Sequence, residues 1–411
     1  MARSFPRGIQ CLVLAALVFL SGTTVNGCSA EPNWPLWDQY AQRFVDQQGR
    51  VIDHTGGDRT TSEAQAYGMF FALVADDHDR FDKLLTWTED NLAQGDLTLH
   101  LPAWNWGKAS DGQWKVLDAN SAADADMWIA YDLLEAGRIW KTSRYEDLGL
   151  VLMDRIAKQE IVNLPCIGKA GGPMLLPAPM GFHPQPDKWI VNPSYLPLPV
   201  LQRFATEQPG GPWYAIIAEL PQLLGQTSVG GFSMDWVQCQ TGKGWLAVPL
   251  PGAAQKEEHP PDNGQTKGQS SAPPAAYGSY DAIRVYLWAG IADPGMSYAK
   301  DLPKAVPGMA NYLKQNITPP LQIDSSGKVL SPDGPAGFSA AVIPYLQALG
   351  MKDAAAKQMA RLEATKDPVT GLYGRTVSYY DQNLALFCMA WTEQRFRFDK
   401  EGHLTLHTKG K

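Results

Sequence analysis

The chain reads Ser121-Ala122-Ala123-Asp124-Ala125-Asp126-Met127-Trp128-Ile129-Ala130 at the start of a segment whose apolar residues recur with the period of an α-helix. Small residues dominate this helix start, so another part of the protein can approach it closely. The next segment, 143–159, has one charged and one apolar face, which is typical of a helix on the outside of a protein. The two segments predict a helical hairpin with one inner and one outer helix.

The same alternation continues along the chain and predicts an all-α fold. Inner-type helices begin near residues 62, 121, 194, 279, 336 and 379. Repetition of the hairpin gives an α/α toroid, in which parallel inner helices place their N-termini and the long loops at one end. The predicted helices are 35–48, 62–76, 78–94, 121–140, 143–159, 194–207, 210–225, 279–292, 300–315, 336–349, 352–366 and 379–396. Strand-like alternation is weak and short, as in 402–408.

Composition describes a globular protein and argues against a nucleic-acid-binding surface. Of 411 residues, 45% are hydrophobic and 19% are charged, and the formal net charge is −7. Nucleic-acid binding requires a clustered basic face, which this charge balance does not favour. The 14 Trp and 15 Tyr residues indicate either a large core or a sugar-binding cleft, because the apolar face of a sugar packs flat on an aromatic ring.

The segment 1–30 has the organisation of a secretory signal peptide. Arg3 and Arg7 supply positive charge, and the stretch from Cys11 to Leu20 is apolar throughout but too short to span a bilayer. Cleavage after Ala30 would release a secreted, periplasmic protein, whereas a lipid anchor on Cys28 is the alternative outcome. No later segment offers about 18 uninterrupted apolar residues, so no transmembrane helix is predicted.

The remaining chain, 31–411, is predicted to be a single catalytic domain with a flexible insertion around 252–277, a segment rich in Pro, Gly, Gln and Ser. Its cysteines are widely scattered and lack C-x-x-C spacing, so no metal site is predicted from them. Export permits a disulfide, for which Cys166 and Cys239 are the better candidates, although the sequence alone leaves the pairing open.

Carboxylates stand at the starts of the predicted inner helices. Glu63 lies in the first turn of the helix at 62–76, behind Thr61 or Ser62 as the cap. This carboxylate either stabilises the helix dipole or acts as a catalytic acid. The second role requires burial or a neighbouring carboxylate to raise its pKa against the effect of the dipole.

The other two helix starts carry Asp124 with Asp126, and Asp281 with Arg284. Asp124 and Asp126 point in different directions, which predicts one helix cap and one functional carboxylate. An Asp-rich metal site is the rival interpretation, but no further acidic ligand stands at near spacing. Arg284 lies on the same helix face as Asp281, three residues on, where a guanidinium keeps a carboxylate ionised. This pair is either a surface ion pair or a general base with its partner.

Aromatic residues accompany these carboxylates at the same end of the predicted toroid. Trp104 and Trp106 follow a helix end and form a candidate stacking platform for sugar rings. The predicted substrate-binding set is Tyr67, Trp104, Trp106, Trp128, Tyr195, Tyr280, Arg284, Tyr379 and Tyr380.

Several sequence blocks, taken in order, resemble the signature of glycoside hydrolase family 8. The blocks are Ser62-Glu63-Ala64-Gln65-Ala66-Tyr67-Gly68-Met69, Ala122-Ala123-Asp124-Ala125-Asp126, Asn192-Pro193-Ser194-Tyr195 and Tyr280-Asp281-Ala282-Ile283-Arg284. The resemblance covers residues 34 to 398 and implies an (α/α)6 barrel with an inverting mechanism.

By this resemblance Glu63 corresponds to the general acid, Asp281 to the base that activates water, and Asp124 to the carboxylate that holds the distorted sugar. Tyr280 and Arg284 would orient Asp281 and the water. Inversion needs the acid and the base roughly 6.5–9.5 Å apart to admit water, and carboxyls on different inner helices can provide that gap.

The resemblance also implies an endo-β-1,4-glucanase that acts on cellulose-like glucan without a metal or an organic cofactor. It also implies an association with bacterial cellulose biosynthesis, with the cellulose synthase export complex as a candidate partner. Two alternatives stay open at this point. One is a non-catalytic glucan-binding component of a cellulose export machine, and the other is a hydrolase of xylan or chitosan on the same barrel.

Overall fold

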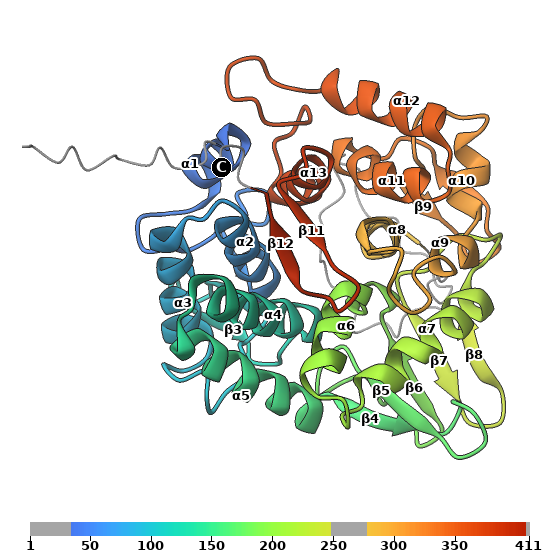
Figure 1. Cartoon of the computed structure of the whole chain (residues 1–411), viewed down its shortest axis with the longest axis horizontal. Coiled ribbons are helices and arrows are strands. Elements are labelled where there is room, and N and C mark those ends of the chain that lie inside the picture. Colours follow the sequence, from blue (N-terminus) through green and yellow to red (C-terminus); the bar gives the residue numbers. More distant parts are fainter. Residues whose placement is uncertain (1–33, 248–277, 408–411) are drawn as a thin grey trace, which may run out of the picture. The chain divides into compact units, whose positions relative to one another are not determined.

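Helices of the two predicted kinds form two concentric layers in residues 34–247 and 278–407, the parts of the chain that this computed structural model describes (Figure 1). The inner helices are α2 (Ser62–Val74), α4 (Ala123–Trp140), α6 (Leu198–Glu207), α8 (Ala282–Ile291), α11 (Ala336–Ala348) and α13 (Tyr379–Thr392). Each inner helix contacts the next one, and α13 returns to α2, so the ring is closed.

The outer layer pairs one helical unit with each inner helix. The outer helices are α1 (Pro35–Phe44), α3 (His78–Leu92), α5 (Ser143–Gln159), α7 (Trp213–Thr227), α9 (Leu302–Ala305) with α10 (Gly308–Leu313), and α12 (Lys352–Glu363). Contacts join α3, α5, α7, α9 and α12 to the inner helix that precedes each of them, and α1 joins α13. The predicted all-α (α/α)6 barrel is confirmed.

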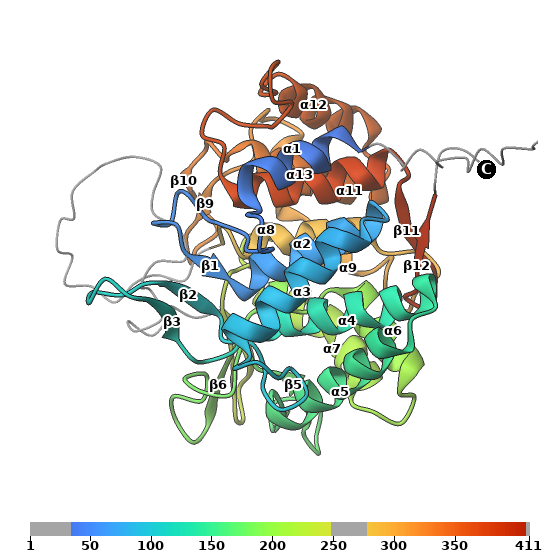
Figure 2. The same cartoon turned by 90° about the vertical axis from the view of Figure 1, so that its left-hand side faces the viewer.

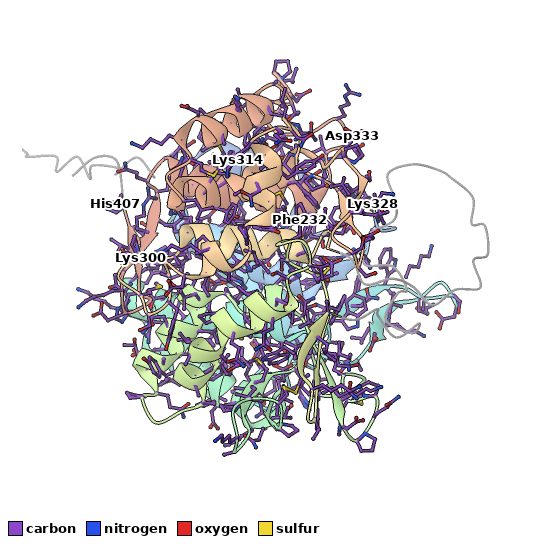
Figure 3. All side chains as sticks on the ribbon, turned by 90° about the vertical axis from the view of Figure 1, so that its right-hand side faces the viewer. Phe232, Lys300, Lys314, Lys328, Asp333 and His407 are labelled. Carbon is purple, nitrogen blue, oxygen red and sulfur yellow. A yellow bond between two sulfur atoms is a disulfide. The ribbon has the colours of Figure 1, made fainter. Side chains whose placement is uncertain are left out.

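Burial separates the two kinds of helix as the sequence pattern predicts. In α4 every residue from Ala123 to Gly137 is buried, whereas α5 buries only one stripe. Side chains occupy the space between the ribbons (Figure 3), and buried aromatic rings from several inner helices contact one another, so the ring is filled rather than hollow. There Trp128 lies 5.1 Å from Phe70, 5.3 Å from Trp288 and 5.4 Å from Phe387 between ring centroids.

Prolines divide two of the predicted helices. The segment predicted as one helix at 300–315 is instead α9 and α10, separated around Pro307, since the residue before a proline disfavours the helical conformation. The helix predicted at 194–207 begins as a single 3₁₀ turn, Pro193–Tyr195, and α6 starts only after Pro197. Both corrections follow from the fixed backbone geometry of proline.

Short strands, which the sequence analysis mostly did not predict, lie in the segments that connect or follow the helices. They are β1 (Thr60–Thr61), β2 (Asn105–Lys108), β3 (Trp114–Asp118), β4 (Ile161–Leu164), β5 (Gly172–Leu175), β6 (Lys188–Val191), β7 (Val237–Gln240), β8 (Gly244–Ala247), β9 (Gln322–Ile323), β10 (Val329–Ser331), β11 (Phe396–Phe398) and β12 (Leu404–Leu406). They pair antiparallel in five small sheets, β1-β2-β3, β4-β5, β6-β7-β8, β9-β10 and β11-β12. All except β11 and β12 belong to segments that lead into an inner helix, which confirms the predicted loop-rich end (Figure 2).

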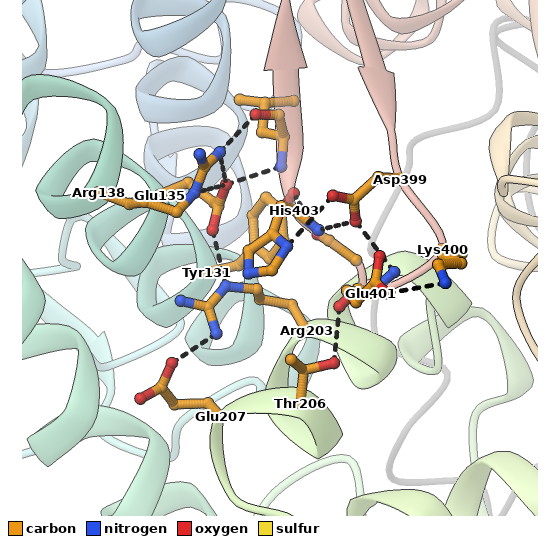
Figure 4. Close-up of polar contacts among 12 residues, drawn as sticks. Tyr131, Glu135, Arg138, Arg203, Thr206, Glu207, Asp399, Lys400, Glu401 and His403 are labelled. Carbon is orange, nitrogen blue, oxygen red and sulfur yellow. Dashed lines mark hydrogen bonds and ion pairs between the residues drawn. The ribbon is translucent and has the colours of Figure 1, made fainter.

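The β11–β12 hairpin covers the opposite end of the ring, where it is held by buried charges (Figure 4). Glu135 of α4 accepts a hydrogen bond from the backbone N–H of Leu404 at 2.7 Å and another from Arg203 Nε at 2.7 Å. The hydroxyl of Tyr131 donates to the carbonyl of Gly402 at 3.0 Å. These contacts fix the β11–β12 hairpin to α4 at the end of the ring away from the inner-helix N-termini.

A disulfide joins Cys166 and Cys239, so this predicted pairing is confirmed. It ties the turn after β4 to strand β7 of the neighbouring sheet. The predicted signal peptide 1–30, with Cys28, and the predicted insertion 252–277 lie outside the described residues. Within 34–247 and 278–407, none of the helices combines the length and the apolar character needed to cross a membrane.

Candidate active site

Three carboxylates from the N-terminal ends of three inner helices meet at one guanidinium. Nη1 of Arg284 donates to Asp124 Oδ2 at 2.8 Å and also contacts Glu63 Oε2. Nη2 of the same side chain donates to Asp281 Oδ1 at 2.5 Å. The Arg284 side chain is only 2% exposed, so these contacts are shielded from water. The structure thus brings together the predicted acid, the predicted base and the predicted sugar-holding carboxylate.

Glu63 is placed by a capped helix start. The Thr61 hydroxyl accepts the N–H of Ala64 at 3.2 Å, which makes Thr61 the cap of α2. The N–H of Ser62 donates to the carbonyl of Trp104 at 3.0 Å, and strand β2 begins one residue later. The candidate acid and the candidate stacking platform are therefore fixed to each other through the backbone.

Asp124 and Asp126 face different surroundings, as predicted, but neither caps α4. The cap position is Ala122, whose side chain makes no capping bond to the described part of the chain. Asp126 instead lies beside Glu160, and the pKa of Asp126 is raised well above its usual value by burial and then by the Glu160 charge. The prediction of a helix cap here was wrong, because Asp126 faces away from the helix start into a buried carboxyl pair.

Glu63 has the pKa that a general acid needs. Burial is the largest influence and raises the pKa of Glu63 to about 7, while Arg284 lowers it and the charges of Asp124 and Asp281 raise it. Desolvation thus outweighs both the guanidinium and the favourable helix start. Near neutral pH a large share of Glu63 is protonated and able to donate its proton.

Burial, the largest influence, also raises the pKa of Asp281 above its usual value. The guanidinium of Arg284 and the side-chain amide of Asn192 both lower the pKa of Asp281. Asp281 and Arg284 are 8% and 2% exposed in their side chains, so the alternative of a surface ion pair was wrong. The contact with the guanidinium favours the ionised form of Asp281, which can accept a proton from water.

The predicted aromatic residues divide into partly exposed rings, called the aromatic wall below, and nearly buried rings. Trp104, Trp106 and Tyr280 are partly exposed. Tyr67, Tyr195, Tyr379 and Tyr380 are nearly buried. Two of the buried tyrosines support the guanidinium: the Tyr67 hydroxyl lies 3.2 Å from Arg284 Nη1, and the Tyr195 ring centroid lies 5.4 Å from Arg284 Cζ.

Trp128 is not part of the wall. It has 0% exposure at the centre of the ring, where a sugar cannot reach it, so the prediction that Trp128 binds substrate was wrong. Trp128 lies in inner helix α4, and its indole packs against aromatic rings from three other inner helices. The motif around it contributes Asp124 to the site and Trp128 to the core.

Two loops add residues to the site, of which the sequence analysis did not single out Asp235 and Trp236. Phe182 and Trp236 stack with ring centroids 5.5 Å apart, and Trp236 lies 6.1 Å from Tyr195. Asp235, next to Trp236, is buried close to Asp281. No local periodicity marks these residues, because their positions depend on contacts between distant segments.

The arrangement can protonate a leaving oxygen from one carboxyl and remove a proton from water with another, beside aromatic surfaces suited to sugar rings. A ring of six inner helices with this site at its loop-rich end defines a glycoside hydrolase of the (α/α)6 type.

Comparison with known proteins specifies the class. Residues 10–249 match the family described as Glycosyl hydrolases family 8. The chain is 40% identical to an endoglucanase of Escherichia coli O157:H7 over 393 residues, covering 95% of each chain. It is 41% identical to an endoglucanase of Xanthomonas axonopodis pv. citri over 372 residues, covering 90% of this chain and 88% of the relative. The crystal structure of an endo-1,4-D-glucanase from Vibrio fischeri ES114 is similar with a TM-score of 0.77 and 34% identity, covering 91% and 99%. The chain belongs to glycosyl hydrolase family 8.

Proposed function

We propose that this family 8 glycoside hydrolase cleaves internal β-1,4 bonds of a cellulose-like glucan with inversion at the anomeric carbon. One observation carries the proposal: a single buried guanidinium contacts Asp124 and Asp281, while Glu63, at the same guanidinium, has a pKa of about 7. Glu63 is therefore partly protonated near neutral pH, while the contact with Arg284 favours the ionised form of Asp281.

The reaction follows from these two states. Glu63 donates its proton to the glycosidic oxygen as the bond to the anomeric carbon breaks. Asp281 accepts a proton from a water molecule that attacks that carbon from the opposite face, so the product has the inverted configuration. Asp124 holds the distorted sugar at the cleavage position. General acid–base catalysis of this kind contributes on the order of 10²–10⁴-fold in rate.

The proposed substrate rests on the relatives and on the aromatic wall. Both curated relatives described above are named endoglucanases, and the Vibrio fischeri protein is named an endo-1,4-D-glucanase. Trp104 and Tyr280 offer partly exposed rings for stacking against a glucan, whereas the Trp106 ring stacks with Trp114 and lies 4.5 Å from the Arg50 guanidinium. Parallel assays on carboxymethyl cellulose, xylan and chitosan test this choice, and faster hydrolysis of xylan or chitosan would replace glucan as the substrate.

A non-catalytic glucan-binding role is the second candidate function. A binder needs the aromatic wall but has no use for an acid and a base at one guanidinium. Measuring the viscosity of a soluble glucan distinguishes the binding role from hydrolysis. A binding protein leaves the viscosity unchanged, whereas an endo-acting hydrolase lowers it rapidly.

The proposed cellular setting is the periplasm, beside bacterial cellulose synthesis, with the cellulose synthase export complex as the partner. The sequence of residues 1–30 supports export, with lipidation of Cys28 as the alternative. The mass of the mature protein purified from its native host distinguishes cleavage after Ala30 from a lipid-modified Cys28.

Glu63→Gln is the direct test of the catalytic assignment. The amide keeps the shape of the side chain but cannot donate the proton, so release of reducing ends from carboxymethyl cellulose should fall at least 10²-fold. Glu219→Gln is the matched control, because Glu219 is also a buried carboxyl with a raised pKa but lies on outer helix α7. Undiminished release by Glu63→Gln would remove Glu63 from the mechanism.

A further inference from the structure

A fourth carboxyl, contributed by a loop, lies against the backbone that carries Asp281. Asp235 stands in the segment between α7 and β7 and is 5% exposed. Its Oδ1 atom accepts the backbone N–H of Ser279 at 2.7 Å and that of Ala282 at 2.8 Å. These two N–H groups lie on either side of Tyr280 and Asp281, so one oxygen fixes the backbone around the candidate base.

Asp235 and two backbone carbonyls together satisfy the first N–H groups of α8: Asp235 accepts from Ala282, the Ser279 carbonyl from Ile283 at 3.1 Å, and the Asp281 carbonyl from Arg284 at 3.0 Å. Asp281 occupies the cap position of α8, and an aspartate there commonly accepts an N–H from the first turn of its own helix. Among the described residues, the Asp281 side chain makes no such bond, and its Oδ1 atom instead accepts from Arg284. Because these three acceptors bond the first N–H groups of α8, the helix start does not need the Asp281 carboxylate, which contacts the guanidinium instead.

The same stretch of backbone is clamped from a second side. Gly278 and Ile323 exchange two backbone hydrogen bonds of 3.0 Å, and the Ser279 hydroxyl donates to the carbonyl of Leu321 at 2.9 Å. A Cβ atom at Gly278 would lie 2.2 Å from the carbonyl oxygen of Ser233, so only glycine fits there. The segment leading into α8 therefore has little freedom, and Asp235 bonds the N–H groups on either side of Tyr280 and Asp281.

We propose that Asp235 is a positioning residue for the general base: by accepting the N–H groups of Ser279 and Ala282 from a neighbouring loop, it fixes the backbone that orients the Asp281 carboxylate. This inference rests on the proposed function, in which Asp281 is the base. The charge balance agrees with the geometry, because burial and then the Asp281 charge raise the pKa of Asp235 to about 8. Near neutral pH Asp235 is thus largely uncharged, and its oxygen still accepts both N–H groups.

The test compares Asp235→Ala with Asp235→Asn on carboxymethyl cellulose. Alanine removes the acceptor and lets the base shift, for which we expect kcat to fall about 10- to 100-fold with KM within about twofold, since small misplacements of a reacting group cost up to about 10²-fold. Asparagine keeps the accepting oxygen, so its kcat should stay within about threefold of wild type. Glu135→Gln is the control for destabilisation, because this buried carboxylate lies at the opposite end of the barrel.

The proposal is overturned if Asp235→Ala keeps wild-type kcat, or if Asp235→Asn loses as much kcat as alanine. Should the alanine variant not fold, Asp235→Ser decides instead: a kcat below that of the asparagine variant supports the proposal, and a wild-type kcat overturns it. Asp281→Asn is measured in parallel and tests the proposed function separately. An active Asp281→Asn enzyme would refute Asp281 as the base, whatever the Asp235 variants show.

Discussion

Replacing Arg284 with lysine separates the three carboxylates from their common partner. The guanidinium reaches Glu63 and Asp124 through Nη1 and Asp281 through Nη2, and all four groups are largely buried. A lysine ammonium is a single point charge on a flexible stem and cannot occupy both nitrogen positions at once. The change therefore keeps a positive charge in the site but removes at least one of its contacts.

The expected loss follows from the contact between Nη2 and Asp281, which is 2.5 Å long. A hydrogen bond to a charged group is worth about 1.5–3 kcal/mol. At about 1.36 kcal/mol for each factor of ten in rate, losing it should lower kcat/KM about 10- to 150-fold. Retention of the positive charge keeps the loss from being larger.

The variant should also change the pH profile in a defined direction. Arg284 lowers the pKa of Asp281, so the pKa of Asp281 should be higher in the Arg284→Lys enzyme. A general base works only when ionised, and therefore the acidic limb of kcat/KM should move to higher pH. A purely structural defect would lower activity at every pH without moving this limb.

Initial rates of reducing-end release from carboxymethyl cellulose, measured across the pH range in which the fold is intact, provide the assay. Arg203→Lys is the matched control, because Arg203 is also buried and joins two carboxylates, Glu135 at 2.7 Å and Glu207 at 2.6 Å, at the far end of the barrel. The reasoning fails if Arg284→Lys keeps kcat/KM within twofold of wild type with an unmoved acidic limb.

Three further outcomes are expected. Because burial raises the pKa of Glu63 to about 7 and the acid works only when protonated, kcat/KM should decline as pH rises through about 7; a constant value up to pH 9 would exclude Glu63 as the acid. Replacing Cys166 and Cys239 by serine opens a cross-link between residues 73 apart and should reduce the free energy of unfolding by about 4 kcal/mol in denaturant titration, whereas an unchanged midpoint would contradict this. Trp104→Ala should raise KM for carboxymethyl cellulose about three- to tenfold with little change in kcat, and an unaltered KM would remove Trp104 from the substrate wall.

Most of the fold could be predicted because inner and outer helices bury different fractions of their surfaces. The segments 62–76, 143–159 and 352–366 were predicted within a few residues of α2, α5 and α12. Their boundaries depend on local signals such as the Thr61 cap. The division at Pro307 was missed because the apolar pattern continues across it.

The strands could not be predicted for a different reason. They have two to five residues each; β1 and β6 pair with β2 and β7, which are distant in sequence, and the other pairs are short local hairpins. Such strands are too short to show the alternation of a half-buried sheet, so nothing local distinguishes them from loops.

The site was predictable where its residues belong to helix starts. Glu63, Asp124, Asp281 and Arg284 each lie within one turn of an inner-helix N-terminus, and the closed ring brings those termini together. Asp235 escaped prediction because its role depends on N–H groups 44 and 47 residues away in sequence.

The configuration of the first product tests the central assignment most directly. Hydrolysis of a soluble β-1,4-gluco-oligosaccharide, followed by proton NMR from the first minutes, records the anomer before mutarotation mixes the two forms. With Glu63 as acid and Asp281 as base, the α-anomer should appear first and the β-anomer only later. Initial appearance of the β-anomer would mean retention, and would contradict a water molecule activated by Asp281.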